Sequence, residues 1–98
     1  MKEYILDCRL TSKAAGNIVT AIEFKMRGEN LAELKHLAVD KRAIRLVEAN
    51  ELFGKLRLRV FVSEKEMFGN PNRLETMYFS CERPYKTFKP SLAFRSEV

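Results

Sequence analysis

The stretch that decides the fold is Lys55-Leu56-Arg57-Leu58-Arg59-Val60-Phe61-Val62. Apolar and polar residues alternate along it, which is typical of a β-strand with one buried face and one face in water. The leucines and valines share the first face. The second face carries Lys55, Arg57, Arg59 and Phe61. Because side chains two apart on a strand lie roughly 7 Å from each other, we expect one side of a sheet to present a cationic stripe that ends in an aromatic ring.

Two further alternating runs precede this strand, at residues 3–10 and 18–27. The segment 11–17 between them contains serine, glycine and asparagine, which favour a hairpin with a loop longer than two residues. After the second run, Asn30 with Glu33 three positions later resembles the capped start of a helix. We expect this helix to bury an apolar stripe formed by Leu31, Leu34, Leu37 and Ala38.

The helix is expected to break near Lys41. On a single helix that continues to residue 53, the basic residues that begin at Lys41 would share a face with the apolar stripe, which argues against such a helix. Ala43–Ala49 then favours a strand, although its leucine and alanine also suit a helix. Residues 50–54 turn the chain into the cationic strand, and residues 69–72 separate that strand from a last alternating run at 74–81.

These elements predict a single α+β domain over residues 1–98, with one helix packed on a mainly antiparallel sheet of about five strands in the order β-β-α-β-β-β. A chain of 98 residues has room for one hydrophobic core. Pro84 and Pro90 cannot donate a backbone hydrogen bond to a sheet. We therefore expect residues 83–98 to form an extended arm or an edge strand.

Neither a membrane span nor a signal peptide is expected. No apolar stretch approaches the ~20 residues that a transmembrane helix needs, and Asp7 interrupts the short apolar run near the N-terminus. We interpret the protein as cytoplasmic. Cys8 and Cys81 lie in predicted strands among apolar neighbours and are expected to be structural thiols. A zinc site needs four ligands with paired spacing, and His36 has only scattered carboxylates to join it, so we expect no metal and no cofactor.

The net charge of +5 is unevenly distributed along the chain. Basic residues outnumber acidic ones by six to two over residues 41–59 and by five to two over residues 73–95. Such clusters suit a phosphate backbone, because neutralised phosphates release their condensed counterions. The alternative is a solvated sheet surface kept basic so that an edge does not pair with another molecule.

The C-terminal segment interleaves aromatic and basic residues at Tyr85, Lys86, Phe88 and Lys89. Aromatic rings stack on unpaired bases while cations follow the backbone, so this pattern suits single-stranded nucleic acid. The same aromatic residues could equally pack under the sheet and complete its core. None of the signatures of an RNA-recognition domain, a helix-turn-helix or a zinc finger is present.

Catalysis has little support in the sequence. Glu33 and Asp40 lie three residues before and four residues after His36, and a carboxylate beside a histidine is the arrangement that orients a general base. No nucleophile or second acid has an evident place beside them, so a solvated polar helix face is the simpler interpretation. We expect the protein not to be an enzyme.

The sequence therefore predicts a small non-enzymatic accessory protein of nucleic-acid metabolism that binds DNA or RNA through a basic sheet face flanked by aromatic residues. The predicted contact residues are Lys55, Arg57, Arg59, Phe61, Tyr85, Lys86, Phe88 and Lys89. The alternative is a protein-binding modulator, an inhibitor or adaptor, that docks an acidic protein surface through the same face or through an edge strand. A homodimer through an edge strand is a further option.

Overall fold

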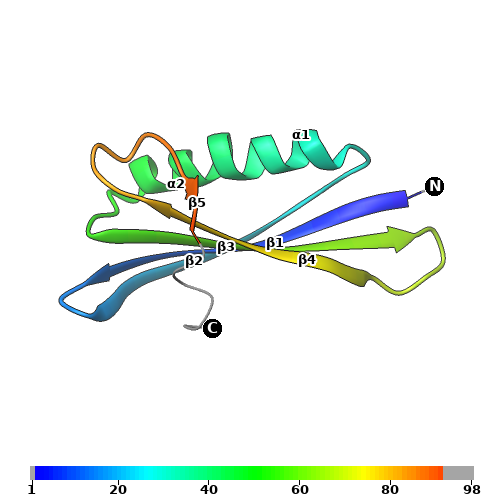
Figure 1. Ribbon diagram of the computed structural model, residues 1–98, viewed down its shortest axis with the longest axis horizontal. Coiled ribbons are helices and arrows are strands. Elements are labelled where there is room, and N and C mark those ends of the chain that lie inside the picture. The colour runs from blue at the N-terminus through cyan, green and yellow to red at the C-terminus, as the bar shows by residue number, and fades with distance from the viewer. Residues whose placement is uncertain (1, 92–98) are drawn as a thin grey trace.

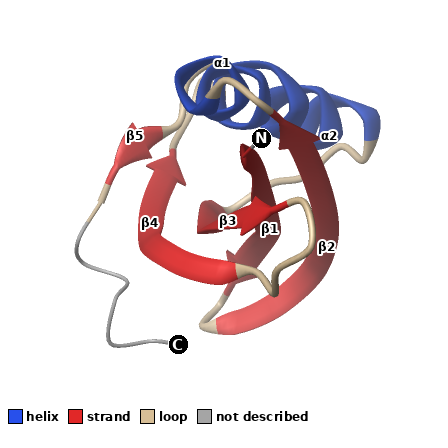
Figure 2. Ribbon diagram, turned by 90° about the vertical axis from the view of Figure 1, so that its right-hand side faces the viewer, coloured by secondary structure: helices blue, strands red, loops and turns tan. Residues whose placement is uncertain are grey.

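The computed structural model describes residues 2–91 as an antiparallel sheet with a long helical segment along one of its faces (Figure 1). The strands are β1 (Lys2–Ala14), β2 (Asn17–Gly28), β3 (Lys55–Glu66), β4 (Asn72–Cys81) and β5 (Lys89–Pro90), in the spatial order β2-β1-β3-β4-β5. The expected α+β class is confirmed. Figure 2 shows the strong twist of the sheet and the helix packed on one side of it. Within the described residues, no helix combines the length and apolar character needed to cross a bilayer.

The core lies between the helical segment and the two central strands, β1 and β3. Residues directly opposite each other on these strands form apolar cross-strand pairs: Leu6 with Val62, Cys8 with Val60, and Leu10 with Leu58. All six are at most 3% exposed. Burying a leucine side chain of this kind contributes about 1.5–3 kcal/mol, so this layer supplies much of the driving force for folding.

The helical segment spans Leu31 to Ala49 without a break, and the strand predicted at Ala43–Ala49 is wrong. It consists of α1 (Leu31–His36), a π-helical stretch η1 (Leu37–Arg42) and α2 (Ala43–Ala49). At the start, the Asn30 side chain accepts a hydrogen bond of 3.0 Å from the backbone N–H of Glu33, which confirms the predicted cap.

The π-helical stretch explains why a helical wheel misplaces the second half of this segment. The backbone N–H of Ala43 bonds to the carbonyl of Ala38, five residues back instead of four. The buried positions are Leu34, Ala38, Val39, Ala43 and Val47, so the stripe advances by four, five and four residues. The extra residue in one turn rotates Ala43 and Val47 onto the helix face that packs against the sheet. Lys41, Arg42 and Arg45 remain exposed to solvent. It also leaves Leu37, expected in the stripe, 37% exposed.

The hairpin between β1 and β2 is tighter than predicted. Ala14 pairs with Asn17, so the loop contains two residues, Ala15 and Gly16. Both have a positive φ, of 52° and 81°, which is the requirement of a type I′ turn. Gly16 adopts its positive φ without strain. A bulge between Ser12 and Lys13 shifts the pairing of β1 with β2 by one residue, so that Ser12 pairs with Thr20.

The two cysteines are buried and free, as the sequence predicted. Burial, with a smaller contribution from the charge of Asp7, raises the pKa of the Cys8 thiol to about 12. Burial also raises the pKa of the Cys81 thiol. Both groups therefore remain protonated thiols at neutral pH and act as small apolar side chains.

Candidate nucleic-acid interface

The side of the sheet that faces away from the helix is called here the open face. On β3 it is formed by the odd-numbered residues, which alternate with buried even-numbered ones from Leu56 to Val62. The pairing of strands extends each of these positions into a row across the sheet. Arg59 lies between Arg9 of β1 and Tyr78 of β4, and Arg57 lies between Thr11 and Ser80. The cationic stripe expected from the sequence is therefore part of a wider polar surface.

The part of the open face on β1 and β2, the paired half, is neutralised by its own acids. Arg9 contacts Glu23 at 3.5 Å, Lys25 contacts Asp7 at 3.6 Å and Arg27 contacts Glu3 at 3.6 Å. Each of these ion pairs joins β1 to β2. Cations and anions thus alternate across this half of the surface.

The part on β3, β4 and β5, the acid-free half, has a different composition. Its charged members are all basic: Lys55, Arg57, Arg59, Lys65, Arg73 and Lys89. Among the described residues, no carboxylate occupies an open-face position on these three strands. Burial lowers the pKa of the Arg57 guanidinium, which starts high enough to remain charged at neutral pH.

At the seam between the two halves, Arg9 and Arg59 stand directly opposite each other on adjacent strands. Lys13 and Lys55 form a second like-charged cross-strand pair farther along the same seam. Like charges in this position destabilise a sheet, because their Cβ atoms are about 4.5–5.5 Å apart. The carboxylate of Glu23 accepts a hydrogen bond of 3.5 Å from Arg9 and balances its positive charge. Within the described residues, the buried Nε of Arg59 has no hydrogen-bond acceptor.

Phe61 holds two of the guanidinium groups on this surface. The Cζ atom of Arg59 lies 4.5 Å from the centroid of the Phe61 ring, and the Cζ atom of Arg73 lies 4.1 Å from it. A cation–π contact at a partly exposed site contributes about 0.5–1 kcal/mol. The ring predicted as a contact residue is thus already used to position two arginines within the protein itself.

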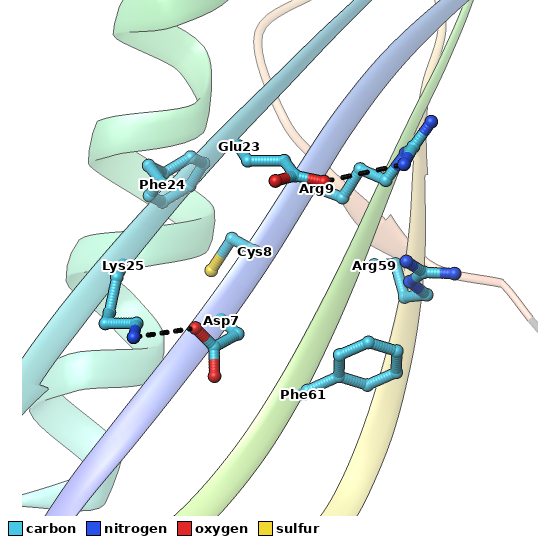
Figure 3. Close-up of a pocket in the computed structure, with 8 residues that line it drawn as sticks. All are labelled: Asp7, Cys8, Arg9, Glu23, Phe24, Lys25, Arg59 and Phe61. Carbon is cyan, nitrogen blue, oxygen red and sulfur yellow. Dashed lines mark hydrogen bonds and ion pairs between the residues drawn. The ribbon is translucent and has the colours of Figure 1, made fainter.

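An open hollow of about 470 Å³ lies on this face where the two halves meet (Figure 3). It is lined by Asp7, Cys8, Arg9, Glu23, Phe24, Lys25, Arg59 and Phe61. Figure 3 shows the ion pairs Asp7–Lys25 and Arg9–Glu23 on one side of it and Arg59 with Phe61 on the other. Pockets for drug-like ligands are mainly apolar, so this charged lining suits a polar or anionic group better.

The predicted contact residues divide into two groups in the structure. Lys55, Arg57, Arg59 and Phe61 share the open face on β3. Lys89 joins them through β5, because it pairs with Ser80, which itself stands opposite Arg57. The predicted edge strand in the C-terminal segment is thereby confirmed for Lys89–Pro90, while residues 92–98 lie outside the described residues.

The other three predicted contact residues belong to the segment 82–88, which runs on the helix side of the sheet (Figure 1). Phe88 is 3% exposed and packs in the core. The Tyr85 hydroxyl accepts a hydrogen bond from the N–H of Gly54 and donates one to its carbonyl, both at 3.0 Å. Lys86 is exposed in the same segment. The structure does not bring these three residues onto the open face.

The Tyr85 contact fixes the start of β3, where a glycine is required. Gly54 has φ +82°, and a Cβ atom at this position would meet the carbonyl oxygen of Lys13. The residue therefore lets β3 approach β1 closely at the end of the seam. Tyr85 thus stabilises the start of β3 from the helix side of the sheet.

Sequence reasoning missed several members of this surface, of which the most important are Arg9, Arg73 and Tyr78. Thr76, Tyr78 and Ser80 alternate with apolar residues along β4, which was a usable signal that they face water. Nothing in the sequence indicates that Tyr78 stands opposite Arg59, because that depends on the register between β3 and β4. The bulge at Val62–Ser63, which brings Arg73 opposite Ser63, was equally hidden.

The histidine lies outside this surface. His36 Nδ1 is 2.8 Å from Asp40 Oδ2, so the predicted pair on the helix is present, and both side chains are about half exposed. Among the described residues, no group of three or more histidine, cysteine or acidic side chains could hold a metal ion.

Comparison of the chain with protein-family models, curated proteins and solved structures finds no match.

Proposed function

We propose that the protein is a non-enzymatic accessory protein of nucleic-acid metabolism that binds DNA or RNA through the acid-free half of its open face. The observation that carries this proposal is the cross-strand pair Arg9–Arg59 at the middle of the sheet. Two cations placed directly opposite each other cost stability in the isolated protein. A phosphate group that lies between them would offset this cost and accept hydrogen bonds from both guanidinium groups.

The surroundings of this pair extend the surface in a direction that suits a polymer. Arg57 lies two residues from Arg59 on β3, and Lys89 lies in the same row two strands away. Arg73 lies on the other side, over the Phe61 ring. The cations thus cover several strands, as the successive phosphates of one nucleic-acid strand require, whereas a single small anion needs only one such point.

The aromatic content of the face favours a single strand over a duplex. Tyr78 is half-buried beside Arg59 and offers a ring to an unpaired base. Such stacking contributes roughly 1–3 kcal/mol per base. The surface lacks a projecting helix or loop that would enter a groove of duplex DNA, because the described open face consists of strands.

The proposal is tested by anisotropy titrations of labelled single-stranded DNA, single-stranded RNA and duplex DNA at low salt. Arg59→Glu combined with Arg73→Glu should weaken binding by at least about tenfold and reduce the slope of log affinity against log salt by about 1.4 to 1.8. The matched control is Lys41→Glu with Arg45→Glu, which changes the net charge equally on exposed helix positions. It should weaken binding by less than about threefold.

Three results would overturn the proposal. The wild-type protein could bind none of the oligonucleotides, which would favour an acidic protein surface as the partner. The two double variants could lose affinity equally, which would mean that net charge alone drives binding. His36→Ala could abolish binding, which would move the site to the helix.

A further inference from the structure

The two edges of the sheet differ in how they are protected. At the far edge, β5 is two residues long and includes Pro90, and both features are common devices against strand pairing. It covers only the end of β4, whose remaining edge at residues 72–77 is interrupted by the bulge at Leu74. The β2 edge is 12 residues long and contains no proline. Within the described residues, β2 pairs with β1 alone, so one row of its backbone donors and acceptors faces outward. A long edge of this kind is a template for another strand.

We propose that β2 pairs antiparallel with β2 of a second copy of this chain, with Phe24 at the two-fold axis. In this register Glu23 stands opposite the partner's Lys25, and Lys25 stands opposite the partner's Glu23. The sheet thus gains two cross-strand charge pairs from a single strand sequence. On the helix side, Phe24 meets the partner's Phe24, and Ile22 meets the partner's Met26.

Neighbouring registers are less favourable for the same residues. A shift of the pairing by two residues in one direction places Glu23 opposite the partner's Glu23, and a shift in the other direction places Lys25 opposite the partner's Lys25. Like charges directly opposite each other are destabilising. A shift by one residue turns one copy over, so that the charged face of one strand adjoins the apolar face of the other. The shift that pairs the two Lys25 residues also places Glu23 opposite the partner's Arg27, so it keeps two opposite-charge pairs beside the like-charged one. The register centred on Phe24 is favoured among these three, because it combines two opposite-charge pairs with no like-charged pair.

The apolar side of β2 is suited to such a contact. Ile22, Phe24 and Met26 pack against the core of their own subunit, yet all three remain partly exposed at the sheet edge. In the dimer each of these side chains gains a neighbour across the axis, and the two cores become continuous. Aromatic and aliphatic cross-strand pairs contribute roughly 0.2–1 kcal/mol each beyond the backbone hydrogen bonds.

The dimer would hold both helices on one side and both open faces on the other. The paired halves would meet at its centre, and the acid-free halves would lie outside them. From β3 to the partner's β3 there are five strand spacings, or roughly 24 Å. The dimer would thus present two proposed nucleic-acid surfaces on the same side. Its formation depends only on the residues of β2 and not on nucleic-acid binding.

Sedimentation of the full chain without nucleic acid tests the proposal. The wild type should show a concentration-dependent species of twice the 11.4 kDa chain mass. Glu23→Lys and Lys25→Glu, each alone, place like charges across the axis and should weaken dimerisation by at least about tenfold. An equimolar mixture of these two variants places opposite charges at all four positions and should recover the dimer as a heterodimer.

The mixture also serves as the control for folding. Each variant lacks the same intrachain ion pair whether it is measured alone or in the mixture, so a dimer that forms only in the mixture cannot be explained by misfolding. The lost contacts, Arg9–Glu23 and Lys25–Asp7, are exposed pairs worth up to about 1 kcal/mol each, and circular dichroism should show both variants folded. A monomeric wild type, single variants that dimerise as tightly as the wild type, or a mixture that stays monomeric would each refute the β2 pairing. None of these results depends on nucleic-acid binding.

Discussion

The paired half and the acid-free half of the open face have the same backbone architecture and opposite electrostatics. Both are built mainly from long antiparallel strands, β1 and β2 in one half and β3 and β4 in the other, whose side chains alternate between the core and water. On β1 and β2, three basic side chains each contact an acid at 3.5–3.6 Å. On β3, β4 and β5, the described open-face residues include six cations and no acid. The excess positive charge of the chain is therefore gathered on one part of one surface.

The different ion pairing of the two halves changes their electrostatic potential more than it changes the folding stability of the protein. Exposed ion pairs contribute about 0–1 kcal/mol each, so the paired half gains little stability from its three contacts. Its attraction for external anions is weakened, because Arg9, Lys25 and Arg27 each have an acid within 3.6 Å. The acid-free half keeps that attraction.

Introducing an acid into the acid-free half is expected to give the largest effect. Tyr78→Glu places a carboxylate directly opposite Arg59 and makes this row resemble the Arg9–Glu23 contact. Binding of single-stranded oligonucleotides at low salt should weaken by about tenfold, since one cation is neutralised and one stacking ring is lost. Tyr78→Gln removes the ring alone and should cause a smaller loss. Equal losses in both variants would show that the ring matters and the local charge does not.

Removing an acid from the paired half should act in the opposite direction with a smaller effect. Asp7→Asn releases Lys25 from its ion pair and extends the basic surface across the seam towards β2. We expect oligonucleotide binding at low salt to tighten by about threefold and the gain to disappear at high salt. Glu51→Gln is the matched control, because Glu51 is exposed in the turn after α2. A gain of the same size in the control would assign the effect to net charge.

Much of the fold could be predicted from the sequence, because alternation of apolar and polar residues directly indicates a β-strand with one face in the core. All four long strands were recognised, and the cap at Asn30 was identified from its spacing to Glu33. The second half of the helix could not be predicted. A wheel drawn at 3.6 residues per turn places Ala43 opposite Leu34, and only the five-residue step from Ala38 restores it to the buried stripe.

The candidate site could be predicted in part, for a related reason. Residues that share a face of one strand are visible in the sequence, so Arg57, Arg59 and Phe61 were found together. Residues that meet across strands depend on register, and register is set by turns and bulges. The neighbours of Arg59 on both sides, Arg9 and Tyr78, were therefore missed. For Tyr85 and Phe88 the sequence left two interpretations open, stacking on bases or packing under the sheet, and their place in the core confirms the second.

The most direct test of the central claim is an NMR titration of the labelled protein with a short single-stranded oligonucleotide. The largest shifts should occur in the side-chain Nε–Hε signals of Arg59 and Arg73 and in the backbone amides around Arg57, Tyr78 and Lys89. The Arg27 signal in the paired half and the amides of the helix should change little. Shifts concentrated on the helix, or spread evenly over both halves of the open face, would show that the acid-free half is not the binding surface.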